Sequence, residues 1–180
     1  MSLPTREQAE KLLIEYVPDT YQKLHAHMVA AGMEAYAAKL NQDKELWYIT
    51  GLLHDLDYCK FPEQHPNKSI EWFKEWQYPE ELITAVADHY VDHQNLAATL
   101  PPMSAALIAI DELAGLMYAY SLMRPNKWED MEVKSVKKKF KDKSFAAKVN
   151  RADISYGVEK LGVDLGEHIA VLVAVFQKTN

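Results

Sequence analysis

Apolar residues return at intervals of three and four along most of the chain, and no segment keeps a strict apolar and polar alternation. Intervals of three and four place side chains on one face of an α-helix, whereas a half-buried strand needs alternation. The chain has only 6 glycines and 8 prolines, and the prolines fall between these segments. The pattern therefore predicts an all-α protein.

The first three helices have recognisable beginnings. Thr5 followed by Gln8 matches a capping box ahead of "AEKLLIEYV", and this helix is expected to end before Pro18. A second helix is expected from about Tyr21, and Asp43 can cap a third, "KELWYITGLLH". In the second helix we predict one apolar stripe, formed by Leu24, Met28, Ala31, Ala35 and Ala38. The adjoining side of the helix carries His25, Val29, Gly32 and Met33.

Prolines separate the remaining helices. The segment "YCKFPEQHP" is predicted to be a loop, because proline cannot continue a helix interior. Amphipathic helices are expected at about 67–77 and over "PEELITAVADHYV", with Pro79 in the first turn. The most apolar helix is "MSAALIAIDELAGLMYAY". A lysine-rich stretch, "VKSVKKKFKDKSFAAKVNR", and an amphipathic helix from Asp164 complete the pattern.

Length and composition favour one ordinary domain. The chain has 180 residues, 48% of them hydrophobic and 26% charged, which is typical of a globular protein. Its formal charge of -6 argues against a general affinity for nucleic acid or anionic lipid. We find no leader-like amino terminus and no run near the roughly 20 apolar residues of a spanning helix, so a cytoplasmic protein without a membrane segment is expected.

The histidines are distributed unevenly. Six of the seven lie before Gln94, namely His25, His27, His54, His65, His89 and His93, and only His168 lies later. Cys59 is the only cysteine, which excludes both an intrachain disulfide and a thiolate zinc site. Imidazole and carboxylate ligands together suit Fe, Mn, Co, Ni or Zn, and Mg is an alternative if fewer imidazoles bind. A single histidine on a helix is more often a buried, hydrogen-bonded side chain.

Two positions favour the metal interpretation. His54 and Asp55 are adjacent, and neighbouring side chains on a helix point about 100° apart, so both can reach one ion only where the helix ends. The predicted helix does end there. Asp111 stands within the apolar segment "ALIAIDELAGL", where a carboxylate must be paired, bound to a metal or turned to solvent.

The order His25, His54-Asp55, Asp111 resembles the H…HD…D signature of the HD-domain superfamily of metal-dependent phosphohydrolases. "HAHMVAAGMEAYA" and "GLLHDLDY" resemble its first helix and its HDIG-type segment. "IDELAGL", "RPNKWED" and the lysine-rich stretch resemble a bacterial branch described only as HD-domain or HDIG-domain proteins. The resemblance implies one HD-type helical bundle over residues 1–180, with a metal-site core at about 20–120 and a C-terminal helical part at about 125–180.

The resemblance also implies a ligand set. Its four residues are His25, His54, Asp55 and Asp111, which would hold one divalent ion. Some members hold two ions, and His65 and His89 occupy places that correspond to the additional histidines, with Asp55 as the bridge. His27 and His93 are expected at the surface or behind the ligands.

The chain departs from the family pattern just after the HD pair. Many members read HDIGK, whereas this chain has Leu56, Asp57 and Tyr58 after Asp55, which removes a lysine that could meet phosphate. Asp57 has three interpretations, as a general base, as a partner that holds a histidine, or as a helix-end cap. Phosphate still needs cations, and the candidates are Lys68, Arg124, Lys127, Lys143 and Arg151, although exposed lysines are usually just solvated.

Three functions follow from these residues. The first is a phosphohydrolase that cleaves a phosphoester of a small metabolite or nucleotide with water activated by the ion. The second is a di-iron oxygenase of the HD fold, which would use all six ligands. The third is a binding module that senses a nucleotide without turnover, which the altered HDIGK segment favours. Nucleic acid is a minor alternative, because the lysine-rich stretch has little aromatic interleaving.

Overall fold

The computed structural model describes residues 3–90 and 99–178, and this part of the chain forms nine α-helices, one short 3-10 turn and no strand. The prediction of an all-α domain is confirmed. The helices are α1 (Arg6–Tyr16), α2 (Thr20–Lys39), α3 (Lys44–Leu53), α4 (Asn67–Glu75), α5 (Glu80–Asp88), α6 (Pro102–Ser121), α7 (Val133–Lys141), α8 (Arg151–Leu161) and α9 (Leu165–Phe176), with the 3-10 turn η1 at Pro62–Gln64.

Side-chain caps set where several helices begin. Thr5 and Gln8 form the predicted capping box, in which the Gln8 N–H donates to Thr5 Oγ1 and the Thr5 N–H donates to Gln8 Oε1. Asp43 caps α3 as predicted, and Asp19 caps α2 in the same way. Such caps satisfy amide donors that have no partner within the helix. Pro79 is the residue before α5 and does not lie in its first turn, a shift of one position.

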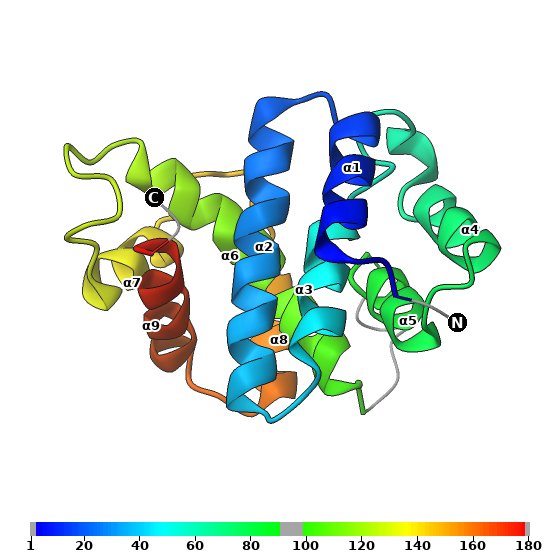
Figure 1. The fold of residues 1–180 in the computed structure, drawn as a ribbon. Helices are drawn as coiled ribbons and strands as arrows, with labels where there is room; N and C mark the ends of the chain where they lie inside the picture. The colour runs from blue at the N-terminus through cyan, green and yellow to red at the C-terminus, as the bar shows by residue number, and fades with distance from the viewer. Residues whose placement is uncertain (1–2, 91–98, 179–180) are drawn as a thin grey trace.

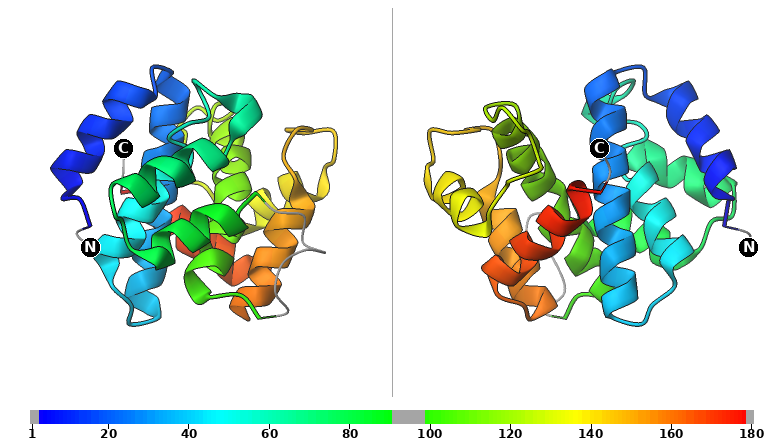
Figure 2. Two further views of the ribbon diagram at one scale, coloured as in Figure 1. Left: turned by 90° about the vertical axis from the view of Figure 1, so that its right-hand side faces the viewer. Right: turned by 60° about the vertical axis from the view of Figure 1, so that its left-hand side comes forward.

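Two long helices, α2 and α6, occupy the centre of the molecule (Figure 1). α3 packs along α2, α8 packs along α6, and α2 and α6 also contact each other. Helices α1, α4 and α5 lie on one side of this pair, and α7 and α9 lie on the other (Figure 1). Figure 2 likewise places α1 and α8 on opposite sides of the molecule. One continuous core of apolar side chains joins both sides.

The apolar stripe predicted on α2 is only partly covered, with Met28 buried at 3% exposure. Leu24 is 41% exposed and Ala38 is exposed, whereas Val29 and Met33 on the adjoining side are fully buried. α2 carries apolar residues around most of its circumference, so periodicity alone does not say which face its neighbours cover. In the fold α3, α6 and α9 cover the side that includes His25, and this side becomes core.

The most apolar helix, α6, is long and apolar enough to cross a membrane by length and composition, but 67% of that window is buried inside the fold. A core helix passes the same test. Most of its residues are buried, and the partly buried ones include Asp111 and Glu112, which reach the cleft described below. The sequence pattern therefore reflects a helix that is covered on nearly all sides.

Helix α8 was not predicted as a separate element. Asn150 caps it, and Gly157 faces α6, where an added Cβ would lie 2.4 Å from the Ala109 nitrogen. Such a close approach is open only to glycine. The lysine-rich stretch shows no apolar pattern that marks a break, whereas in the structure residues 142–150 separate α7 from α8.

Candidate metal centre

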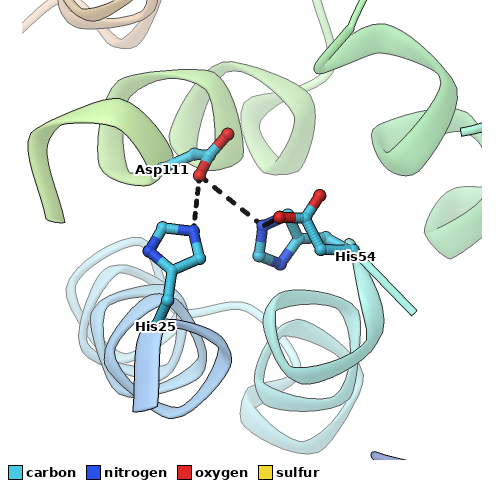
Figure 3. A group of neighbouring side chains, drawn as sticks. His25, His54 and Asp111 are labelled. Carbon is cyan, nitrogen blue, oxygen red and sulfur yellow. Dashed lines mark hydrogen bonds and ion pairs between the residues drawn. The ribbon is translucent and has the colours of Figure 1, made fainter. Parts of the chain in front are cut away.

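Three segments of the fold bring four predicted ligands together. Figure 3 shows His25 of α2, His54 at the end of α3 and Asp111 of α6 pointing toward one another. His25 Nε2 lies 2.8 Å from Asp111 Oδ1, and His54 Nε2 lies 3.6 Å from the same oxygen. With Asp55, the ligand atoms of this group all lie within 4.8 Å of one another. We call these four residues the primary group.

A glycine lets α3 approach α2 closely enough to form this group. A Cβ on Gly51 would lie 2.8 Å from Ala30 Cα and 2.9 Å from Ala30 N. The contact places the end of α3 beside α2, so the rings of His54 and His25 are 5.4 Å apart between centroids. α3 ends one residue before His54, and residues 54–60 form turns, so both His54 and Asp55 reach the cluster.

A second group shares Asp55 with the primary group. It contains Asp55, His65 and His89, whose ligand atoms also lie within 4.8 Å of one another. Asp55 Oδ1 lies 3.4 Å from His65 Nε2 and 3.6 Å from His89 Nε2. Asp55 Oδ2 faces the other way and lies 3.3 Å from His54 Nε2. One carboxylate therefore stands between the two groups, as a bridging ligand would.

Backbone carbonyls fix the tautomers of two histidines. His54 Nδ1–H donates to the Gly51 carbonyl over 2.8 Å, and His89 Nδ1–H donates to the Val86 carbonyl over 2.5 Å. In the neutral ring the proton then resides on Nδ1, which leaves the Nε2 lone pair directed at the carboxylates. Metal-binding histidines commonly have this arrangement.

Asp57 orients the ring of His65, as the backbone carbonyls orient those of His54 and His89. Its Oδ1 accepts a hydrogen bond of 2.6 Å from His65 Nδ1, and its Oδ2 accepts one of 2.9 Å from the Ser69 amide in the first turn of α4. Asp57 is fully buried and does not line the cleft. Burial alone would raise the pKa of Asp57, but His65 and Ser69 lower it below its usual range. This geometry favours the histidine-holding interpretation over the general base, and the carboxylate also contacts the first turn of α4 through the Ser69 amide.

The charges of the primary group reinforce one another. Burial lowers the pKa of His54, but Asp55 and Asp111 outweigh burial and hold that pKa well above 6.5. Burial raises the pKa of Asp55, but His54 and His89 more than reverse this effect. The pKa of Asp111 is likewise below its usual range, because His25 and His54 outweigh burial. The negative charge of Asp55 and Asp111 that favours a proton on His54 also favours a bound metal cation.

The donor set fits a divalent ion. His54 Nε2 is buried without a hydrogen-bond partner, although it faces two carboxylates. A buried polar atom without a partner is costly, and a bound cation would satisfy it. The atoms available are imidazole nitrogens and carboxylate oxygens, which suit Fe, Mn, Co, Ni or Zn. His25, His54, Asp55 and Asp111 would hold one ion, and His65 and His89 would complete a second site.

A sequence profile agrees with this geometry. The profile of the HD domain matches residues 24–134, which is more than half of the chain and contains all six ligand candidates. The chain belongs to the HD-domain family. Comparisons with curated proteins and with solved structures return no match. The predicted family membership is therefore confirmed at the level of the HD domain.

The HD domain's two groups lie at a cleft of about 940 Å³. The cleft is lined by His25, Asp55, His65, His89 and Asp111, so ligands of both groups face it. Its other walls come from three tyrosines (Tyr21, Tyr58 and Tyr90), from α6, and from residues 146–150 together with Ala152 and Asp153. A cleft of this size accommodates a small molecule.

Glu112 and Tyr21 are cleft residues that the sequence did not single out. Burial and the neighbouring Asp111 carboxylate raise the pKa of Glu112 to about 7. Burial, with a smaller contribution from Asp111, raises the pKa of Tyr21 to about 12. Glu112 also accepts a hydrogen bond of 3.1 Å from the Asn150 amide, which joins α6 to the segment before α8. In the sequence, the only indication that Glu112 belongs to the site is its position directly after Asp111.

The predicted phosphate-binding cations lie away from the HD domain's cleft. Lys68 pairs with Glu71 at 2.6 Å, and Arg124 pairs with Asp130 and donates to the Lys127 carbonyl. Lys127 and Lys143 are exposed. None of the five candidates, Lys68, Arg124, Lys127, Lys143 and Arg151, lines the cleft. Lys148, which was not predicted, does line it.

Two further histidines lie outside the groups. His27 is 41% exposed at its side chain and faces Glu10 at 3.4 Å. This agrees with the surface position expected for it. His93 lies outside the described residues. The buried His168 belongs to the core, where Tyr36 and the Ala109 carbonyl contact its ring nitrogens.

Proposed function

We propose that this HD-domain protein is a metal-dependent phosphohydrolase that cleaves a phosphoester of a small metabolite or nucleotide. The observation that carries the proposal is the pair of histidine and carboxylate groups that share Asp55 at one cleft. A bound divalent ion would lower the pKa of a water molecule and polarise a phosphoryl oxygen, so the protein would need no nucleophile of its own.

The chain's own residues would place the substrate and the ligands. Asp57 and the carbonyls of Gly51 and Val86 hold the imidazoles in the required orientation. The tyrosines of the cleft offer flat faces to an organic group, and Tyr21 keeps its phenol protonated as a hydrogen-bond donor. These features support a small organic phosphoester as the substrate, held with its phosphorus near the two groups.

A di-iron oxygenase is the second candidate. The six side chains provide four imidazoles and two carboxylates, a mixed set that suits iron. Two bound irons and substrate-dependent oxygen uptake would favour this function over phosphoester hydrolysis. Stabilisation by a nucleotide without product would instead identify a binding module.

Elemental analysis of protein made without a metal-binding tag tests the first requirement. We expect one or two equivalents of a transition metal in the wild-type protein, and His54→Ala should lose the ion of the primary group. His27→Ala is the matched control, because His27 lies outside both groups, and it should keep the metal.

A screen of phosphoesters with the metal-loaded protein then tests the reaction. Phosphate release that is absent in His54→Ala would support the hydrolase, and oxygen consumption should be measured in parallel. Wild-type protein that binds no metal after reconstitution would exclude both enzymatic functions.

A further inference from the structure

One wall of the cleft lies outside the residues that match the HD-domain profile. The profile ends at residue 134, whereas residues 146–150 and two positions in α8, Ala152 and Asp153, line the cleft. Most of this wall belongs to the segment 142–150, which joins α7 to α8, and Figure 2 shows the segment on the same side of the molecule as α8, opposite α1. The match to the family therefore says nothing of what this wall contacts.

Arg151 holds the segment in place through its guanidinium group. Its Nε donates to the Phe140 carbonyl over 2.7 Å, and Nη2 donates to the carbonyls of Phe145 over 2.5 Å and Asp142 over 3.0 Å. Nη1 donates to the carbonyls of Ala146 and Val149, both over 3.3 Å. A planar fork of donors can fix several carbonyls at once, which a lysine cannot do.

A second contact fixes the far end of the segment next to the primary group. The Asn150 amide donates to Glu112 Oε2 over 3.1 Å, and Glu112 is the residue after Asp111. Lys148 lies between these two anchors, one residue from Val149, whose carbonyl Arg151 binds. The backbone that carries Lys148 is therefore held at the cleft on both sides.

Lys148 supplies the positive charge in this wall. Among the described residues that line the cleft it is the only lysine or arginine, while Asp55, Asp111, Glu112 and Asp153 are acidic. Within the described chain no carboxylate forms an ion pair with its ammonium group. The acidic side chains would repel a phosphate unless cations offset their charge. Bound metal would supply positive charge at the two ligand groups, and Lys148 is the cation that the protein itself supplies in this wall.

We propose that Lys148 binds the phosphate oxygens of the substrate and that Arg151 is the positioning residue that holds Lys148 at the cleft. This inference rests on the proposed phosphohydrolase function. It assigns recognition of an anionic phosphomonoester to a part of the chain beyond the matched HD domain. It also gives Arg151 a role different from direct phosphate contact, because its donors are engaged by carbonyl oxygens.

Kinetics with a phosphomonoester found in the screen test the role of Lys148. Lys148→Ala should lower kcat/KM by about 10- to 100-fold, the usual range for a lost charged hydrogen bond, mainly through KM, and Lys148→Arg should recover most of the loss. Lys141→Ala is the matched control, because Lys141 is exposed and does not line the cleft. An unchanged kcat/KM in Lys148→Ala, or an equal loss in Lys141→Ala, would overturn the proposal.

Binding of inorganic phosphate separates this inference from the proposed function. Isothermal titration of metal-loaded protein should show weaker phosphate binding, by about 10-fold or more, in Lys148→Ala and unchanged binding in Lys141→Ala. If no phosphoester is hydrolysed but this difference is found, the hydrolase function fails and Lys148 remains an anion-binding residue. Equal phosphate affinity in the three proteins overturns the assignment of Lys148.

The positioning role of Arg151 must be tested by a measurement that a general loss of stability would not change. Arg151→Lys should raise KM while leaving kcat nearly unchanged, and the double variant with Lys148→Ala should be little worse than Lys148→Ala alone. Additive losses in kcat/KM would show that Arg151 does not act through Lys148 and would overturn its positioning role. Circular dichroism of each variant ensures that folded proteins are compared.

Discussion

His65 and Asp57 are joined by a hydrogen bond of 2.6 Å between Nδ1 and Oδ1, and both side chains are buried. The bond leaves His65 Nε2 facing Asp55, which belongs to both groups. A carboxylate behind a histidine orients the ring and makes it a better ligand. Asp57 therefore influences the second group without lining the cleft.

We expect Asp57→Asn to weaken binding of the second ion by about 10- to 100-fold while the first ion is retained. Metal titration followed by elemental analysis measures both. Glu63→Gln is the control, because Glu63 is an exposed acid two residues from His65 and should have no effect. A variant that keeps both ions yet loses turnover would instead identify Asp57 as a general base.

Asp55 differs from every other ligand because it faces both groups. Asp55→Ala should abolish retention of all metal, whereas His89→Ala should remove only the ion of the second group. Elemental analysis after dialysis distinguishes one lost equivalent from two. Retention of one ion in Asp55→Ala would mean that the primary group binds without it, contrary to the shared arrangement.

Much of the candidate site could be predicted because its signals are local or belong to the family signature. The capping residues Thr5 and Asp43 act within one helical turn, and the helix starts predicted from them are confirmed. The His54-Asp55 pair marked the end of α3, and Asp111 marked a charge in an apolar helix. The structure brings both into one group with His25.

The features that the sequence could not reveal depend on contacts between distant segments. Periodicity placed Leu24 on one apolar stripe of α2 and Val29 on the adjoining side, and only tertiary packing shows that Leu24 is 41% exposed whereas Val29 is buried. Arg151 is a candidate for phosphate binding in the sequence, and only the folded chain shows that its donors contact carbonyls between residues 140 and 149. Lys148 carried no local signal within a lysine-rich stretch, and only the folded cleft distinguishes it.

Gly157 tests the packing of α8 on α6. An added Cβ would lie 2.4 Å from the Ala109 nitrogen and 2.7 Å from its Cα, so Gly157→Ala should destabilise the fold by about 1–3 kcal/mol. Gly115→Ala is the control, because its nearest atom, the Tyr21 hydroxyl, is 3.4 Å away. In this variant we expect no loss, or a gain of about 0.5–1 kcal/mol from helix propensity. Equal denaturation midpoints for the two variants would contradict the close α6–α8 contact.

His168 gives the fold a calculable sensitivity to acid. Burial lowers the pKa of His168 to about 4, while its Nε2–H donates to the Ala109 carbonyl and its Nδ1 accepts from Tyr36. An unfolded histidine has a pKa of about 6.5, so between these values the unfolded chain binds a proton that the folded chain does not. The contribution of His168 to the free energy of unfolding is therefore fully present above about pH 6.5. It falls by about 1.4 kcal/mol per pH unit as the pH decreases toward 4.

His168→Gln removes this titration, so its free energy of unfolding should fall less steeply than that of the wild-type protein between pH 6.5 and 4. Denaturant unfolding of both proteins in a chelator measures the difference, because metal-free samples exclude proton competition at the metal ligands. The difference between the two proteins should change by roughly 3 kcal/mol across this window and stay constant above it. Parallel curves would mean that His168 is protonated in the folded protein and would contradict the buried neutral ring between Tyr36 and Ala109.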